Sequence, residues 1–223
     1  MWRGFFYGLF VGARLEDSPS PKSYPQSMTP TNTTPNKKPS RRSIRLKGYD
    51  YRHPAGYFVT ICVKDALCLF GEILDGQMEL SNIGRIIDSE WLIVGESFQY
   101  VELDVYCLMP NHFHGILWLT HELPDGENDF DRAKLPSSDQ LASPLQKRPG
   151  GAKVGSLGAV LGRFKSTTTR RVNRIRGFKG VSLWQRNYWE RIIRNERELE
   201  AFRKYGNNPL SWKQDKLYFR HGI

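Results

Sequence analysis

The residues best suited to chemistry are two histidines, His112 and His114, which one apolar residue separates. They belong to an apolar run, residues 105–119, that predicts a buried strand in which alternate side chains point to the same face. Both imidazoles then project from one side of the strand, where they can share a divalent metal ion. The same pattern also fits two polar residues on a half-exposed strand, so the rest of the chain has to decide between these readings.

Positive charge is concentrated in one part of the chain. The net charge is +10 and the pI about 9.6, which favours an anionic partner, nucleic acid above all. Between Gln140 and Trp189 there are eleven Lys and Arg and no acidic residue. A solvated face is one explanation, but a helix of one sign, predicted over residues 156 to about 176, repels itself unless phosphates cover it. The residues expected to contact DNA are Arg163, Lys165, Arg170, Arg171, Arg174, Arg186 and Arg191.

Aromatic residues alternate with cations after this helix, a mixture typical of sites where unstacked bases meet a phosphate track. Trp184 and Trp189 are nevertheless expected to belong to the core. A metal site next to a basic groove suggests phosphodiester chemistry, and that reaction also needs a nucleophile. Tyr205 is a candidate, because it lies on a short predicted helix directly before Gly206. A tyrosine attacks phosphorus as phenolate, so a nearby cation has to lower its pKa. Packing of Tyr205 is the alternative that helical spacing leaves open.

The predicted elements follow one another in the order β-β-β-α-β-β-α-β-α. Residues 1–42 are expected to be a disordered extension, 43–223 the folded domain, and about 121–153 a flexible insertion. Asp75-Gly76 suits a hairpin turn, and Ser81 and Asn195 suit helix caps. This order predicts an α+β fold with helices on one face of an antiparallel sheet. No apolar stretch is long enough to span a membrane, and three cysteines without a Cys-x-x-Cys pair indicate reduced thiols in the cytoplasm.

Four motifs in this order resemble the REP-associated tyrosine transposases, which are single-tyrosine, IS200-like members of the His-hydrophobic-His nuclease superfamily. The motifs are residues 109–116 (MPNHFHGI), 161–166 (LGRFKS), 183–194 (LWQRNYWERIIR) and Tyr205 before Asn207-Asn208-Pro209. The resemblance covers roughly residues 43–217. It implies a ferredoxin-like α+β fold and a homodimer that acts on DNA in the cytoplasm, close to the nucleoid. It also implies that the protein nicks and rejoins single-stranded DNA near hairpin-forming palindromes.

The same resemblance implies a role for each matching residue. His112 and His114 correspond to the two metal ligands, with Asn208 as the best match for the third, and the metal would be Mg²⁺ or Mn²⁺. Tyr205 corresponds to the nucleophile, which forms a 5′-phosphotyrosine and frees a 3′-hydroxyl. Independently of the resemblance, a mechanism consistent with these residues has a Lys or Arg of the basic helix neutralise charge on the phosphate. Tyr188 is a second tyrosine in the region and is the alternative candidate for the nucleophile.

One segment departs from the family pattern. Tyr205 reaches Pro209 in four residues where the family usually has five, and Gly206 replaces an apolar residue. One helical residue corresponds to about 100° of rotation, so the loss changes the direction of Asn208. This departure motivates an alternative from another class, a domesticated protein that binds single-stranded DNA hairpins without cutting them. A zinc hydrolase is disfavoured because no further metal-binding cluster accompanies the two histidines.

Overall fold

Four strands form an antiparallel sheet in the order β4 (Val101–Met109), β5 (His112–Leu119), β1 (Ala55–Cys62) and β6 (Trp189–Ile193). A separate hairpin pairs β2 (Gly71–Leu74) with β3 (Gln77–Leu80) around Asp75-Gly76, and the short 3-10 helix η1 (Lys64–Ala66) precedes it. The helices are α1 (Asn82–Ser97), α3 (Leu157–Arg176) and α4 (Glu196–Gly206). The predicted α+β class, antiparallel sheet and element order are confirmed.

This computed structural model describes residues 45–46, 48–123 and 152–206. The chain divides into two units, residues 1–42 and 43–223. The predicted disordered extension, most of the predicted flexible insertion and the predicted third ligand Asn208 lie outside the described residues. In the described ranges none of the helices has the length and apolar content that crossing a bilayer requires.

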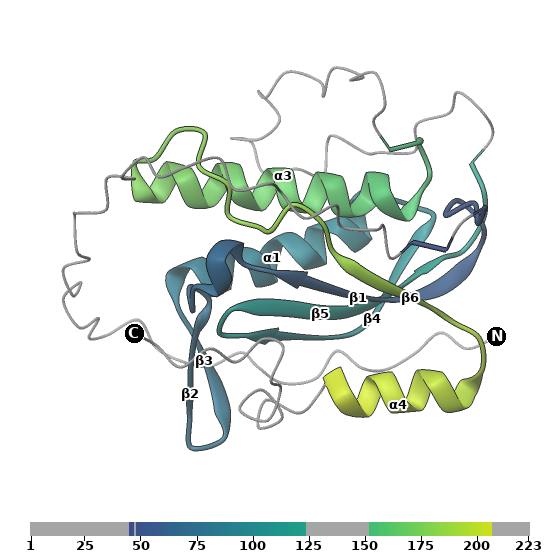
Figure 1. The fold of residues 1–223 in the computed structure, drawn as a ribbon, viewed down its shortest axis with the longest axis horizontal. Helices are drawn as coiled ribbons and strands as arrows, with labels where there is room; N and C mark the ends of the chain where they lie inside the picture. The colour runs from purple at the N-terminus through teal and green to yellow at the C-terminus, as the bar shows by residue number, and fades with distance from the viewer. Residues whose placement is uncertain (1–44, 47, 124–151, 207–223) are drawn as a thin grey trace, which may run out of the picture. The chain divides into compact units, whose positions relative to one another are not determined.

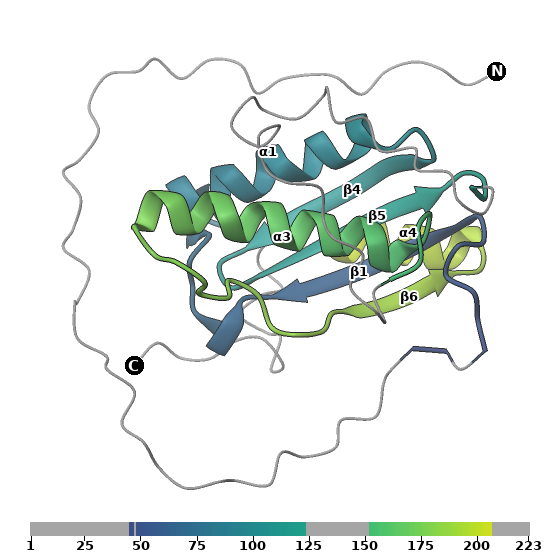
Figure 2. The ribbon, with the colours of Figure 1, turned by 90° about the horizontal axis from the view of Figure 1, so that it is seen from above.

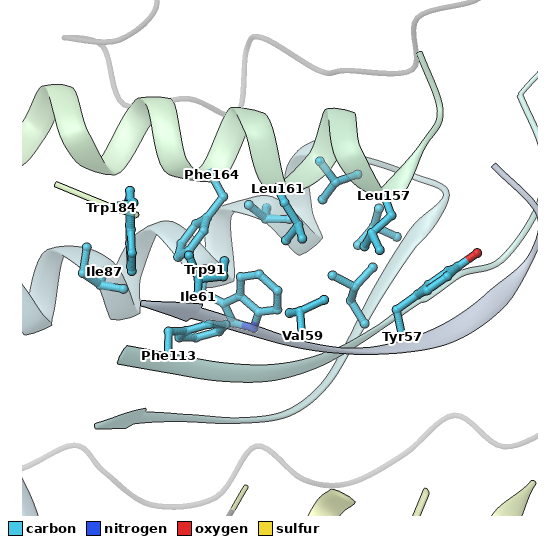
Figure 3. Close-up of a cluster of buried hydrophobic side chains, with 14 of the residues drawn as sticks. Tyr57, Val59, Ile61, Ile87, Trp91, Phe113, Leu157, Leu161, Phe164 and Trp184 are labelled. Carbon is cyan, nitrogen blue, oxygen red and sulfur yellow. The ribbon is translucent and has the colours of Figure 1, made fainter. Parts of the chain in front are cut away.

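The main core lies between the sheet and the pair α1 and α3. The two helices lie side by side over one face of the sheet, as Figure 2 shows. Alternate residues of β1, namely Tyr57, Val59 and Ile61, are fully buried beneath them. Figure 3 shows the rings of Trp91 and Phe164, one from each helix, meeting over this row. Because alternate residues of a strand point to opposite faces, the other face of the sheet is available to pack against other elements.

Helix α4 lies on that other side of the sheet, below it in Figure 1. The expectation of helices on one face thus holds for α1 and α3 and does not extend to α4. A small apolar cluster attaches the helix, with Leu199 and Phe202 contacting Phe58 of β1 and Ile116 of β5. The predicted cap is confirmed, because Asn195 Oδ1 accepts a hydrogen bond of 2.9 Å from the backbone of Glu198.

Candidate active site

Strand register places both histidines on the face that α4 covers. His112 lies opposite Cys62 of β1, and His114 lies opposite Thr60. The intervening Phe113 points the other way, into the main core. The two histidines are only 1% and 2% exposed, and their Nε2 atoms lie 2.8 Å apart. The half-exposed alternative is therefore wrong, because the imidazoles are buried and face each other.

A neighbouring polar group orients each ring through its other nitrogen. His112 Nδ1 lies 2.8 Å from Asn111 Oδ1, and His114 Nδ1 lies 2.8 Å from Thr60 Oγ1. An amide oxygen only accepts, so His112 Nδ1 donates and the lone pair on its Nε2 faces His114. Burial, with the neighbouring imidazole as second cause, holds the pKa of His112 well below its ordinary value. At neutral pH His112 is therefore a neutral imidazole, the form that binds metal.

This donor set fits a divalent cation. His112 Nε2 lies 2.8 Å from His114 Nε2 and accepts a hydrogen bond from it when that nitrogen carries the proton. When His114 Nε2 carries no proton, metal–nitrogen bonds of about 2.1 Å reach both nitrogens from one point. Hydrogen bonds to the outer nitrogens are the usual support of metal-bound histidines. Among the described residues no three His, Cys, Asp or Glu side chains are placed to hold a metal. Further ligands would be an amide, water or a substrate oxygen.

Tyr205 lies beside the histidine pair. Its ring centroid is 5.2 Å from that of His114, with the rings edge to face, and the residue is 38% exposed. Beneath it, the Phe58 ring is stacked between His114 and Phe202, at centroid distances of 5.5 and 4.5 Å. Helical spacing explains the arrangement, because Leu199, Phe202 and Tyr205 follow one another every three residues along the face of α4 that meets the sheet. The fold thus brings together all three described residues that were predicted to do chemistry.

Ionic contacts fix the position of α4 on the sheet. Arg203 donates hydrogen bonds of 3.1 and 2.6 Å to the two carboxylate oxygens of Asp104 in β4. Asp104 also accepts from the indole of Trp118, and although burial opposes it, the hydrogen bond from Arg203 lowers the pKa of this carboxyl. Because Arg203 lies two residues before Tyr205, this bidentate pair holds the end of the helix that carries the candidate nucleophile.

Tyr188, the alternative candidate for the nucleophile, does not lie with the histidines and Tyr205. Tyr188 packs against the main core, and its hydroxyl accepts a hydrogen bond of 2.6 Å from Arg45. Burial raises the pKa of Tyr188 to about 12, which disfavours the phenolate that a nucleophile requires. Of the two tyrosines, only Tyr205 lies beside the histidines.

The basic helix α3 lies on the face of the sheet opposite α4 (Figure 1), whereas the strand register places the histidines on the α4 face. Lys165 and Arg171 of this helix have internal partners: Lys165 Nζ donates to the carbonyl oxygens of residues 185–187, and Arg171 pairs with the buried Glu90 of α1. Burial lowers the pKa of Lys165 to about 8. The expectation that a cation of this helix acts at the histidines is therefore wrong, because the sheet separates the two.

The other predicted DNA contacts differ in position. Arg163 and Arg170 are half-buried on α3, whereas Arg174 and Arg186 are exposed. Arg191 shares the face of the histidines, because it pairs with Phe58 across the sheet. DNA contact by these residues stays a prediction.

The two tryptophans expected in the core also differ. Trp184 is buried and donates from its indole to Thr168 Oγ1 at 2.8 Å, which confirms the expectation. Trp189 is 36% exposed and lies opposite Thr60, on the face of the histidines, so its assignment to the core was wrong. As an edge residue of β6 it has neighbours on one side only among the described strands, and α1 and α3 cover the opposite face.

Replacing Thr60 by Val is expected to weaken Mn²⁺ binding about 10- to 100-fold. Valine keeps the size of the buried side chain but removes the hydroxyl that orients His114. Titration of the metal-free protein with Mn²⁺, followed by electron paramagnetic resonance, measures the change. Thr167→Val is the matched control, since it removes a buried hydroxyl that bonds within α3 on the other side of the sheet. Unchanged affinity in Thr60→Val would exclude the orienting role.

Replacing Arg171 by Met is expected to lower the free energy of unfolding by about 3–5 kcal/mol, because it removes the guanidinium that pairs with the buried Glu90. Urea denaturation measures the change. Arg176→Met, at an exposed position of the same helix, should stay within about 0.5 kcal/mol of the wild type. A second change, Glu90→Met, should restore most of the loss. A stable Arg171→Met protein with weakened DNA binding would instead assign Arg171 to the DNA interface.

Several residues of the site were not assigned a role from the sequence. The motif that contains Asn111 was noticed, but its contact with His112 depends on the turn that precedes β5. Thr60 and Asp104 lie 54 and 99 residues from their partners His114 and Arg203, a separation that no local pattern reveals. Alternation of polar and apolar residues along β1 would have placed Thr60 on the face opposite the core.

A Haemophilus influenzae protein, described as uncharacterized, is 36% identical over 179 residues, which are 80% of this chain and 93% of the relative. No family model matches the chain. One similar solved structure is a REP-associated tyrosine transposase bound to a REP hairpin, the family that the motifs resemble, with a TM-score of 0.45 and 14% identity over 80% of this chain and 76% of that one. Another is a candidate transposase of Deinococcus radiodurans, with a TM-score of 0.34 and 12% identity over 72% of this chain and 93% of that one. At these identities and scores the case for a function rests on the site residues.

Proposed function

This chain belongs to the same family as the Haemophilus influenzae protein, and we propose that it is a transposase that nicks and rejoins single-stranded, hairpin-forming DNA through Tyr205. The observation that carries the proposal is the convergence of the two Nε2 atoms and the Tyr205 ring on one face of the sheet. The REP hairpin held by the structural neighbour suggests the kind of DNA to test.

Tyr205 carries out the covalent steps of the proposed reaction. The phenol oxygen of Tyr205 forms a bond to the phosphorus, the bond from phosphorus to the 3′ oxygen breaks, and the downstream segment stays on the tyrosine through its 5′ phosphate. The phenol proton passes to solvent, and the departing 3′ oxygen gains a proton. Rejoining reverses these steps, and because one phosphodiester replaces another, no nucleotide triphosphate is consumed.

The histidine pair would hold Mn²⁺ or Mg²⁺ beside the phosphate. Bound there, the cation supplies positive charge to the phosphate oxygens and to the phenolate. Two imidazoles suit Mn²⁺ better than Mg²⁺, which prefers oxygen ligands. Asn208 remains the proposed third ligand. His112 and His114 have fixed ring orientations through Asn111 and Thr60, so little rearrangement is needed to bind the ion.

A nicking assay on labelled single-stranded DNA tests the proposal. The protein is incubated with a 5′- or 3′-labelled oligonucleotide that carries a palindromic hairpin and a single-stranded flank, with Mn²⁺ or with EDTA. The expected product is a free 3′-hydroxyl fragment together with a covalent protein–DNA adduct that survives denaturing electrophoresis. Tight hairpin binding with no adduct at any metal concentration would favour the alternative, a binding protein that no longer cuts.

A further inference from the structure

Trp189 extends the candidate site along the edge of the sheet. It pairs with Thr60, which pairs in turn with His114, so the three side chains form one row across the face that α4 covers. The Trp189 ring meets the Phe58 ring edge to face at a centroid distance of 5.9 Å, and the Tyr205 ring meets the same Phe58 ring at 6.2 Å. Two exposed aromatic rings therefore flank the phenylalanine that lies under His114.

The exposure of Trp189 separates it from the other described tryptophans. Trp91 and Trp184 are buried, and Trp118 is half-buried with its indole bonded to Asp104. Trp189 is 36% exposed, and a large ring left accessible on the face of a candidate site offers a flat surface to a ligand. It lies in one row with Thr60 and His114, so the accessible ring belongs to the face that carries the candidate site.

A cation accompanies this ring on the same strand. Arg191 lies two residues further along β6, about 7 Å away, and points to the same face. Its guanidinium is exposed and lies 3.2 Å from Glu198 of α4, a surface ion pair that contributes little to stability. An exposed ring followed by an exposed guanidinium is the combination by which proteins follow a single strand, the ring stacking on a base and the cation contacting a phosphate.

We propose that Trp189 is a stacking platform for an unpaired base of the DNA strand that enters the site, with Arg191 contacting a phosphate of the same strand. The inference rests on the proposed function and deepens it by naming the surface that receives the single-stranded flank. Stacking of this kind is tolerant of sequence, since every base has a π-face. The platform therefore accounts for positioning of the strand and leaves sequence recognition to other residues.

Binding of a fluorescein-labelled single-stranded oligonucleotide, measured by anisotropy in EDTA, tests the platform apart from cleavage. Trp189→Ala is expected to bind about 5- to 150-fold more weakly than the wild type, the range that removal of one stacked base gives. Trp189→Leu, which keeps apolar bulk against Phe58, should lose as much, whereas Trp189→Phe should retain most of the affinity. A blunt duplex of the same sequence should bind all variants equally, because its bases are already stacked.

Phe178→Ala is the matched control, because Phe178 is an exposed aromatic residue, 46% accessible, with the Arg176 guanidinium 4.6 Å from its ring, just beyond the end of α3. Its affinity should equal that of the wild type. Unchanged affinity of Trp189→Leu, or an equal loss in Phe178→Ala, overturns the platform even if the wild type forms the covalent adduct. Weakened binding of Trp189→Leu supports the platform even if the wild type never nicks, so the two proposals fail separately.

Discussion

Tyr205→Phe is expected to abolish the covalent protein–DNA adduct and to lower the nicking rate by roughly 10³-fold or more, while hairpin binding stays within about twofold of the wild type. Removal of a covalent nucleophile costs orders of magnitude in rate because no other group takes its place in the reaction. The substitution deletes one hydroxyl and keeps the ring, which rests against His114 and Phe58. Helix α4 therefore keeps its position on the sheet, and the substitution removes only the nucleophilic hydroxyl.

Denaturing electrophoresis of the labelled adduct and a gel-shift titration measure the two quantities on the same preparation. Tyr188→Phe is the control, since its hydroxyl bonds to Arg45 away from the histidines and its removal should leave nicking intact. If Tyr205→Phe still forms the adduct while Tyr188→Phe does not, the nucleophile has been assigned to the wrong tyrosine.

Local sequence patterns predicted the strand and the helix that carry the site residues, but not how these elements pack against each other. Alternation along a strand was enough to place His112 and His114 on one face, and a cap followed by apolar residues at helical spacing was enough to locate α4. The face on which α4 packs depends on its small apolar cluster with Phe58 and Ile116, which involves residues more than 80 positions away. No periodicity in a single segment reports such contacts, because both faces of a half-apolar strand can accept a helix.

The distribution of charge along the sequence was the least reliable predictor of the residues that bind DNA. A run without acidic residues favoured a DNA-binding helix, yet Lys165 and Arg171 have partners inside the protein. Those partners are backbone carbonyls and a glutamate of α1, and neither is visible as a nearby acid in the sequence. Conversely, Trp189 looked like core because tryptophan usually is buried, whereas its place on an edge strand leaves it accessible. Both errors arise because burial is decided by tertiary neighbours.

His114→Ala is expected to abolish the stimulation of nicking by Mn²⁺, with a fall of roughly 10²- to 10³-fold in rate, and to leave folding intact. A single imidazole holds a divalent ion far more weakly than two that converge, so the phosphate loses its cation. In the apo protein the two Nε2 atoms lie 2.8 Å apart and share a hydrogen bond, which the substitution removes. It also removes the stacking of His114 on Phe58, so the variant should melt at a lower temperature than the wild type while keeping its fold.

Thermal melting separates this loss of metal from a loss of structure. A ligand that binds only the native state raises the melting temperature, so Mn²⁺ should shift the wild type upward and leave His114→Ala unmoved. His121→Ala, at an exposed histidine just beyond the end of β5, should behave as the wild type in both assays. A His114→Ala protein that keeps both the Mn²⁺ shift and EDTA-sensitive nicking would place the ion elsewhere. The proximity of Tyr205 to the histidines would then be packing, and the argument for a phosphotyrosine mechanism would lose its cation.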